Sequence, residues 1–394
     1  MSNWQILPLG KALTFQRGFD STKTEQQDGP YPVFSSSGAK STHAEFKVRG
    51  PGVIIGRKGS LGTVFYSDGD FWPHDTTLWV KDFHSNDPSF AYYFLQTMGF
   101  ERLDAGASNP TLNRNHIHTI LVRWPPLPTQ RKIAAILSAY DDLIENNLRR
   151  IKILEEMAQA IYREWFVKFR FPGHKKVRMV DSLLGKILEG WEVKTVADIV
   201  DIKSGFAFKS KTYVKNGKYG IVTIKNVKDG VFISECESML NHVPPNMPSH
   251  CMLSTGDILL SLTGNVGRAC LLYGDGYLLN QRVAKLVHRE NTGRAFVYLT
   301  YRQKEFQHRL EMLSTGVAQQ NLSPINMGKM EFILPTIKLL KRFEDCFDVF
   351  IERIISLNLT VTNLRRTRDL LLPKLISGEL EVSDLDIKTG GYVQ

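Results

Sequence analysis

The sequence lacks the features that mark secreted, membrane-spanning and metal-binding proteins. Of its 394 residues only four are cysteines, and none of these (Cys236, Cys251, Cys270, Cys346) stands in a C-x-x-C pair. This spacing excludes a zinc ribbon and a thioredoxin-like motif, and reduced thiols are the expected state. No apolar run approaches the roughly 18 residues of a membrane span, and the polar start MSNWQ does not resemble a signal peptide. We therefore expect a soluble protein that stays in the cytoplasm.

Motifs for catalysis are absent as well. Adenine or cytosine methylation needs a segment of the type D/N-P-P-Y/F, and the nearest string, VPPN at 243–246, lacks both the acidic or amide residue and the aromatic one. No G-x-x-x-x-G-K-[ST] loop is present to hold ATP. The glycines of segment 56–62 do not make a dinucleotide fingerprint, and a tight turn between strands explains them better. We therefore expect no catalytic residues in this chain.

A nuclease pattern can be assembled, but the other half of the chain argues against it. Glu192-Val-Lys194, with Asp181 upstream, has the E-x-K spacing of metal-dependent nucleases. The equivalent residues of the first half, 5–7 (QIL), carry neither a carboxylate nor a lysine. Charged side chains on a surface strand are the favoured interpretation, and no metal site is assigned.

The charge balance favours a polyanionic partner. Lys and Arg number 50 against 40 Asp and Glu, which gives a net charge of +10. An excess of this size is typical of nucleic-acid-binding proteins, although it also suits a soluble basic protein with no such partner.

What the chain does have is a match with itself about 210 residues apart. Two apolar stripes with 4-3 spacing indicate two long helices, because this rhythm forms a coiled-coil seam. The first stripe comprises Ile133, Leu137, Tyr140, Ile144, Asn147, Ile151, Leu154, Ala158, Ile161 and Trp165, and the second Phe343, Phe347, Phe350, Ile354, Leu357, Val361, Leu364, Arg368, Leu371 and Leu375. The polar members, Asn147 and Arg368, either fix the register or mark points where the seam frays.

The repeat extends beyond the helices. Gly18-Phe19 corresponds to Gly205-Phe206, the segment 53–62 to 258–267, and 106–112 to 316–322. Short β-rich runs punctuated by Gly, Asn and Asp surround these segments. The sequence therefore predicts an α+β fold in which two globular domains alternate with two long helices, with an internal pseudo-two-fold repeat.

The ends of the two helices follow from proline and glycine. We expect the first helix from about Thr129 to Phe169, stopped by Pro172-Gly173. The second is expected to begin near Leu339 and to bend or end at Pro373, because an interior proline loses a hydrogen bond and clashes with the preceding turn.

Polar residues gather at matching loops of the two halves, and these are the candidate DNA contacts. Asn and Gln can pair with adenine and Arg with guanine in the major groove, while Lys can neutralise phosphates. For any single residue, a polar loop side chain in water is the competing interpretation. The candidates are Arg57, Lys58, Ser60, Asn109, Asn113, Arg114, Lys209, Lys225, Asn265, Arg268, Gln319, Gln320 and Asn321.

Across essentially its whole length the chain resembles the specificity subunit of a type I restriction-modification system. The segments PPLPTQRKI (125–133), QAIYREWF (159–166) and FPG (171–173) resemble that family's central conserved region, and LLLPKLISGEL (370–380) resembles its distal one. GFAFKS (205–210) and GDILLSLTGNVG (256–267) resemble its target-recognition domains. The chain departs from the pattern after Pro335, where it lacks the Pro-x-x-x-Gln lead-in of the first helix. A looser or differently packed start of the second helix is therefore expected.

The resemblance implies the organisation and the partners. Residues 1–128 and 173–337 would be two target-recognition domains, the second with an N-terminal linker. Residues 129–172 would be the central long helix, and 338–394 the distal helix with a C-terminal tail. The helices would pair as an antiparallel coiled coil, space the two parts of a bipartite double-stranded DNA target, and dock two modification (methyltransferase) subunits.

The resemblance also implies where the chemistry resides. S-adenosylmethionine, ATP and Mg²⁺ would be bound by the modification subunits and by restriction (translocase/nuclease) subunits, and this non-catalytic chain would bind none of them. The competing function is a coiled-coil adaptor that binds nucleic acid without sequence preference.

Overall fold

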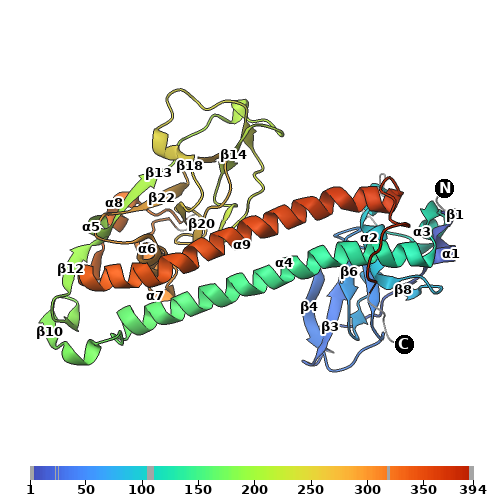
Figure 1. The fold of residues 1–394 in the computed structure, drawn as a ribbon, viewed down its shortest axis with the longest axis horizontal. Helices are drawn as coiled ribbons and strands as arrows, with labels where there is room; N and C mark the ends of the chain where they lie inside the picture. The colour runs from blue at the N-terminus through green and yellow to red at the C-terminus, as the bar shows by residue number, and fades with distance from the viewer. Residues whose placement is uncertain (1–3, 23, 25, 104–110, 317–319, 390–394) are drawn as a thin grey trace. The chain divides into compact units, whose positions relative to one another are not determined.

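The computed structural model describes residues 4–389, except residues 23, 25, 104–110 and 317–319 (Figure 1). The chain separates into two compact units: unit 1, Met1–Glu145 with Asn363–Gln394, and unit 2, Asn146–Thr362. Each unit has its own hydrophobic core, and each long helix contributes one part to unit 1 and the other to unit 2.

Unit 1 contains two sheets and a strand pair. The four-stranded antiparallel sheet has the order β2 (Thr14–Arg17), β8 (Thr77–Asp82), β5 (Gly52–Gly56), β6 (Val64–Ser67). The three-stranded sheet has the order β4 (Gly38–His43), β3 (Tyr31–Ser35), β7 (Trp72–Pro73), in which β3 and β7 run parallel. The strand pair joins β1 (Gln5–Pro8) to β9 (Leu121–Trp124).

Strand β5 shows why this segment is apolar throughout. Successive side chains of a strand point to opposite faces. Val53 and Ile55 belong to the main core of unit 1, whereas Ile54 belongs to a second cluster with Phe34 and Phe71. The strand is therefore covered on both faces.

The short helices of unit 1 cover its main core. They are α1 (Leu9–Ala12), α2 (Pro88–Gln96), the 3-10 turn η1 (Phe100–Leu103) and α3 (Arg114–Thr119). Helix α2 begins at Pro88, directly after its N-cap residue Asp87. The Asp87 carboxylate accepts a hydrogen bond from Phe90 N at 2.8 Å, and proline is favoured in the first turn of a helix.

Unit 2 contains an antiparallel sheet with the same strand order as in unit 1, a second sheet of four strands, and three strand pairs. Its antiparallel sheet has the order β13 (Val200–Ser204), β22 (Val283–His288), β19 (Ile258–Ser261), β20 (Ala269–Leu271). Its second sheet has the order β17 (Met239–Leu240), β14 (Tyr219–Val222), β21 (Tyr277–Leu279), β18 (Met252–Leu253), in which β14 and β21 run parallel. The strand pairs are β12 (Glu192–Thr195) with β23 (Glu331–Leu334), β15 (Val227–Lys228) with β16 (Val231–Phe232), and β10 (Met179–Ser182) with β11 (Gly185–Leu188).

Unit 2 also repeats the two-sided central strand. In β19, Ile258 and Leu260 belong to the main core and Leu259 to a second cluster. The short helices are α5 (Val196–Ile199), α6 (Arg294–Tyr301), α7 (Lys304–Leu313) and α8 (Pro324–Gly328), with 3-10 turns η3 (His174–Lys176), η4 (Ser210–Thr212) and η5 (Ser249–Cys251).

The first long helix lies close to its predicted position, and the second extends further than expected. Helix α4 (Leu127–Tyr162) continues as a π-helical turn, η2 (Arg163–Val167), and the chain leaves it at Phe169, whose φ is +58°. Helix α9 (Ile337–Ser377) passes through Pro373, so of the two expected outcomes, a bend or an end at that proline, the end was wrong. The last turn is retained because Leu375 and Ile376 are buried in the core of unit 1.

The side chains expected in the seam lie inward in both units. None of Ile133, Leu137, Tyr140, Ile144, Ile151, Leu154, Ile161, Trp165, Phe343, Phe347, Phe350, Ile354, Leu357, Val361, Leu364 and Leu371 is exposed. In unit 2 Trp165 lies edge-on to Phe343, with ring centroids 5.5 Å apart. In unit 1 Ile133 and Leu137 share a core with Leu375, and Arg368 forms an ion pair with Asp141. In the seam of unit 1, Arg368 therefore has a partner on α4.

The starts of the two long helices are packed differently. In unit 1 the buried Gln130 amide accepts from Asp87 N at 2.9 Å and donates to Asn86 Oδ1 at 2.7 Å. In unit 2 the equivalent residue is the buried Leu340, and Glu344 of α9 instead accepts from Ala295 N at 2.8 Å. Where the second long helix lacks the Pro-x-x-x-Gln lead-in, the neighbouring short helix α6 is therefore capped by Glu344, in place of the Gln130 contact beside α2.

No helix among the described residues is both long enough and apolar enough to cross a membrane.

Candidate nucleic-acid interface

In unit 1 a glycine turn connects β5 and β6. Gly59 and Gly62 both have φ near +74°, a conformation that favours glycine. Gly62 N donates to Gly56 O at 2.9 Å, and Gly56 N donates to Thr63 O at 2.8 Å. The tight-turn interpretation of the glycine-rich segment is correct.

This turn is joined to the loop before α3. Leu112 N donates to Arg57 O at 3.0 Å, and Lys58 forms an isolated β-bridge with Thr111. Asn113 caps α3 by accepting from Asn115 N at 2.9 Å, and Arg114 follows it in the exposed first turn. The structure therefore brings together Arg57, Lys58, Asn113 and Arg114, candidates from segments about 55 residues apart.

The side chains of the unit 1 turn differ in how far they are exposed. Ser60 is exposed, whereas Arg57 and Lys58 are half-buried. The Nη1 atom of Arg57 is buried, and no hydrogen-bond partner for it lies within the described part of the chain. A buried guanidinium nitrogen without an acceptor is costly, and it marks a position where an acceptor on a ligand would be stabilising.

Unit 2 contains a glycine turn of the same construction between β19 and β20. Gly264 and Gly267 have φ of +73° and +80°. Gly267 N donates to Ser261 O at 3.1 Å, and Ser261 N donates to Arg268 O at 2.9 Å. The same interatomic connections thus hold both turns.

The unit 2 turn is likewise joined to the loop before the following short helix. Gly264 N donates to Gln320 O at 3.1 Å, and Thr263 forms an isolated β-bridge with Asn321. A cavity of about 310 Å³ lies at this junction, lined by Asp229, Gly264, Asn265, Val266, Arg268, Gln307, Glu311 and Gln320. The structure therefore brings together Asn265, Arg268, Gln320 and Asn321.

Two candidates, Lys209 and Lys225, lie apart from these clusters. Lys209 is exposed at the N-cap of η4. Lys225 forms an ion pair with Glu237 at 2.7 Å, so its ammonium already has an anionic partner. Asn109 and Gln319 lie outside the described residues.

Each cluster contains a tight β-turn that sequence reasoning missed. In unit 1 Thr77 N donates to His74 O at 2.9 Å, and Thr76 O accepts from Arg57 N at 2.8 Å. In unit 2 Val283 N donates to Asn280 O at 2.9 Å. The sequence feature that indicates the unit 2 turn is the polar run 280–282 between two buried strands, which is typical of a turn.

A buried polar network lies behind the unit 2 cluster. Tyr298 Oη donates to Glu155 Oε1 at 2.5 Å, and Arg302 Nε lies 3.7 Å from Glu155 Oε2. Arg302 also pairs with Asp229, which lines the cavity beside Arg268. Burial alone would lower the pKa of Arg302, but Tyr298, Asp229 and Glu155 raise it above its ordinary value. The network connects α4, through α6, to the edge of the candidate interface.

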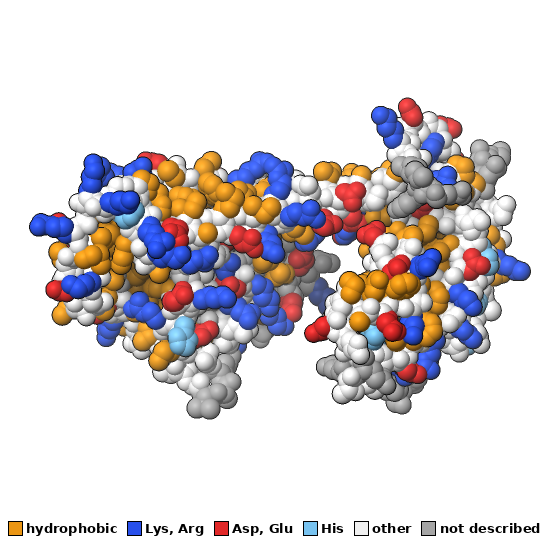
Figure 2. All heavy atoms as spheres, turned by 90° about the horizontal axis from the view of Figure 1, so that it is seen from below, with side chains coloured by type: hydrophobic (Ala, Val, Ile, Leu, Met, Phe, Trp, Pro, Cys, Tyr) orange, Lys and Arg blue, Asp and Glu red, His pale blue; other side chains and the backbone are white. Residues whose placement is uncertain are grey.

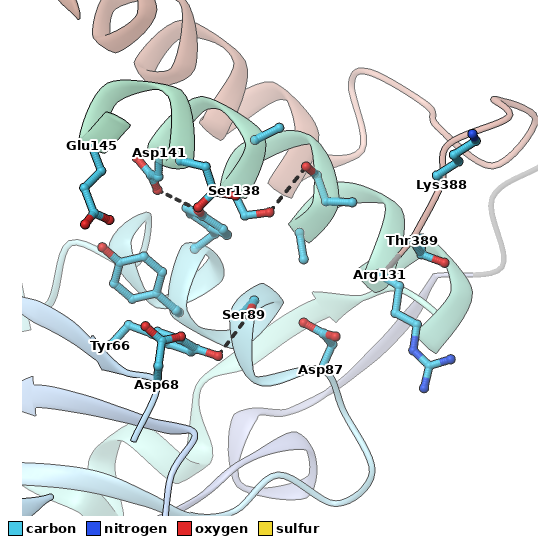
Figure 3. A pocket seen from close by; sticks show the side chains of 16 residues that line it. Tyr66, Asp68, Asp87, Ser89, Arg131, Ser138, Asp141, Glu145, Lys388 and Thr389 are labelled. Atoms are coloured by element: carbon cyan, nitrogen blue, oxygen red, sulfur yellow. Dashed lines mark hydrogen bonds between the residues drawn. The ribbon is translucent and has the colours of Figure 1, made fainter. Parts of the chain in front are cut away.

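A larger cavity in unit 1 is acidic. It measures about 670 Å³, and its polar lining includes Tyr66, Asp68, Asp87, Asp141 and Glu145 (Figure 3). Tyr93 donates to Asp141 at 2.6 Å, and burial together with this hydrogen bond raises the pKa of Tyr93. Carboxylates repel phosphate, so this cavity does not suit the DNA backbone.

The charged residues of the nuclease-like pattern are paired on the surface. Glu192 and Lys194 are exposed on β12, with Nζ and Oε2 2.9 Å apart, and Asp181 pairs with Lys186 at 3.2 Å. Within the described residues, no group of three or more His, Cys, Asp or Glu is placed to hold a metal ion. Figure 2 shows Lys and Arg side chains interspersed with Asp and Glu on the coloured part of the face it draws.

Comparison with known proteins gives consistent matches. A family model described as "Type I restriction modification DNA specificity domain" matches residues 1–156 and 188–363. The chain is 26% identical over 306 residues to the MjaIX specificity subunit of Methanocaldococcus jannaschii, covering 75% of this chain and 70% of that protein. It is 23% identical over 405 residues to the MjaVIII specificity subunit of the same organism, covering 98% and 94%. A solved S subunit from M. genitalium superposes with a TM-score of 0.63 at 19% identity, covering 95% of this chain and 96% of that one.

Proposed function

The chain belongs to the type I restriction-modification DNA specificity family, and we propose that it is the specificity subunit that selects a bipartite DNA target. The observation that carries this proposal is the double occurrence of one loop construction. Each family match contains a glycine turn joined to the loop before a short helix, through the bridges Lys58–Thr111 and Thr263–Asn321. Two such clusters in one chain suit the reading of two separate DNA segments.

The clusters suit base recognition because their backbones are held and their side chains are polar. Arg268, Gln320 and Asn321 offer donors and acceptors that match the major-groove edges of guanine and adenine. In unit 1, Arg57, Lys58 and Arg114 supply positive charge for bases or phosphates. In this proposal unit 1 reads one part of the target and unit 2 reads the other.

The long helices take the role of spacer in the same proposal. Helices α4 and α9 pair as an antiparallel coiled coil, and the duplicated halves form a pseudo-two-fold repeat. Support comes from the shared cores: Ile133 clusters with Leu375, whereas Trp165 clusters with Phe343. The early part of one helix thus meets the late part of the other. The four-segment division with boundaries after residues 128, 172 and 337 is part of this proposal.

The remaining parts of the complex follow from the family. Two modification subunits dock on the helices and methylate adenine, and restriction subunits add translocation and cleavage. S-adenosylmethionine, ATP and Mg²⁺ belong to those partners, and this chain acts in the cytoplasm as a non-catalytic subunit. The surface pairing of Glu192 with Lys194 supports leaving these residues without a catalytic role.

The test is a selection of duplexes from a randomised library by the purified full chain, with single-stranded DNA and RNA as competitors. We expect a consensus of two specific segments separated by a gap of constant length. Equal binding to all duplexes would favour an adaptor without sequence preference and would overturn the proposal.

A second test concerns catalysis. The chain alone should show no methylation, and adenine methylation at the selected sequence should appear when the modification subunit and S-adenosylmethionine are added. Turnover by the pure chain would contradict the non-catalytic role, and loss of that turnover in Glu192→Ala would assign it to the E-x-K pattern.

A further inference from the structure

The β-turn of unit 2 places two polar side chains at its tip. Gln281 and Arg282 are the central residues of the turn closed by the hydrogen bond from Val283 N to Asn280 O, 2.9 Å. The Asn280 side chain strengthens the turn, since its Oδ1 accepts from Arg282 N at 3.3 Å. Asn at the first position of a turn commonly makes this contact.

The backbone of this turn is held by three neighbouring segments. Asn280 N donates to Val222 O at 3.1 Å, and Gln281 N donates to Phe206 O at 3.1 Å. Arg282 O accepts from Leu262 N at 3.0 Å, directly before the glycine turn of unit 2. The Cα positions of Gln281 and Arg282 are therefore fixed beside the cluster that contains Arg268 and Gln320.

The backbone of Gln281 and Arg282 is held, but their side chains are not. Both are exposed, and within the described part of the chain neither makes a side-chain hydrogen bond or an ion pair. A rigid backbone carrying uncommitted polar side chains is pre-organised for a ligand, because binding then orders few additional groups.

The side chains of the equivalent turn in unit 1 are engaged differently. Asp75 pairs with Arg17 at 2.9 Å, and its other carboxylate oxygen lies 2.9 Å from His74 Nδ1. The Thr76 hydroxyl accepts from Ser36 N at 3.3 Å and lies 3.1 Å from His74 Nδ1. The side chains at the unit 1 turn therefore already have partners within unit 1, whereas those at the unit 2 turn are available for a ligand.

Resting on the proposed function, we infer that Gln281 and Arg282 determine the sequence read by unit 2. Gln281 reads an adenine and Arg282 a guanine, since these side chains form bidentate contacts with those bases in the major groove. Consecutive Cα atoms lie about 3.8 Å apart, close to the 3.4 Å rise of a base pair, so the two bases are neighbours in the target.

The test uses the full chain and a randomised duplex library, from which the wild type yields its consensus. Arg282→Ala should lose preference for guanine at one position of one segment, by about 5- to 150-fold against the other bases. Gln281→Ala should lose preference for adenine at the adjacent position by a similar factor. The other segment of the consensus should be unchanged in both variants.

Two further variants distinguish base reading from charge. Arg282→Lys keeps the positive charge but lacks the planar guanidinium fork, so it should weaken the guanine preference while keeping the salt-dependent part of the affinity that Arg282→Ala loses. Arg178→Ala removes one exposed arginine from the hairpin of unit 2, where it pairs with Glu189 at 3.0 Å, and should leave the consensus intact.

The outcomes distinguish a failure of the proposed function from a failure of the assignment of Gln281 and Arg282. A wild-type chain that selects no consensus would overturn the proposed function itself. A wild-type consensus retained by Arg282→Ala and Gln281→Ala, or weakened equally at every position, would overturn only the assignment of these two residues. Circular dichroism of each variant verifies the fold, which both substitutions should preserve because they leave the backbone contacts in place.

Discussion

Removing the charge of Arg302 should destabilise unit 2 strongly, because it leaves Glu155 buried without its cation. The side chains of Arg302 and Glu155 are 10% and 11% exposed, and Nε and Oε2 are 3.7 Å apart. At an effective dielectric constant of about 20, two unit charges at this distance attract by roughly 4 kcal/mol. Breaking a buried pair by removing one partner costs about 3–5 kcal/mol in other proteins. We expect Arg302→Met to lower the free energy of unfolding of unit 2 by about 3–5 kcal/mol.

The second partner of Arg302 contributes less to this loss. The side chain of Asp229 is 47% exposed, so water can solvate its carboxylate when the guanidinium is removed. Glu155 keeps its hydrogen bonds from Tyr298 Oη and Gln159 Nε2 but has no other cation within 4 Å among the described residues. Adding Glu155→Gln should therefore recover part of the loss, and the double variant should be more stable than the sum of the single effects by about 1–3 kcal/mol.

The measurement is urea unfolding followed by hydrogen exchange of the α6 amides, which reports on unit 2 alone. Arg178→Met is the matched control, because Arg178 pairs with Glu189 on the surface, where water solvates the carboxylate left behind, and its removal should change stability little. If Arg302→Met lowers the free energy of unfolding as little as this control, the Arg302–Glu155 pair is solvated. If the effects of Arg302→Met and Glu155→Gln simply add in the double variant, the two side chains are not coupled. Either result would refute the buried ion pair.

Three further predictions concern recognition, spacing and pH. Arg57→Ala should relax one position of the segment read by unit 1, at a cost of about 1–3 kcal/mol in binding, whereas equal weakening on all sequences would mark a phosphate contact. Inserting four residues near Asn147 adds about 6 Å of helix, close to two base-pair steps, and should lengthen the gap in the genomic methylation pattern; an unchanged gap with full activity would refute the spacer role. Burial raises the pKa of Glu344 although Ala295 N and Phe296 N donate to it, so the folded state binds its proton more tightly than the unfolded state. Stability of unit 2 should therefore fall as pH rises from about 4.5 through the raised pKa, and Glu344→Gln should lose this part of the pH dependence in thermal melts.

The long helices could be predicted from the sequence because their signal is local and periodic. Residues spaced 4-3 along the chain face one side of a helix whatever the rest of the protein does. The inward positions of Ile133, Trp165 and Phe343 follow from this spacing alone. The helix was expected to bend or end at Pro373, and it does not end there because burial of Leu375 and Ile376 outweighs a missing hydrogen bond near the helix terminus.

The loop contacts could be predicted only where the two halves could be aligned. Matching glycine turns pointed to Arg57 and Arg268, and the structure places both beside the loops expected from the alignment. The ion pair of Lys225 with Glu237 joins two irregular loop segments 12 residues apart, and no local pattern predicts it. The polar run 280–282 is a local signal for the turn of Gln281 and Arg282, but the position of this turn is set by hydrogen bonds from segments up to 75 residues away.

The hydrogen bonds that hold the loop clusters have a consequence for how such a protein changes its target. The bridges Lys58–Thr111 and Thr263–Asn321 run between backbone atoms, as do the bonds that hold the turn of Gln281 and Arg282, apart from the contact of Asn280 Oδ1 with Arg282 N. Backbone contacts do not depend on which side chain a residue carries, unless the residue is proline or must adopt a positive φ. The side chains at the turn tips can therefore be exchanged without loss of the contacts that position them. This separation explains how unit 1 and unit 2 share the strand order of the antiparallel sheet and turn geometry while carrying Asp75-Thr76 in one turn and Gln281-Arg282 in the other.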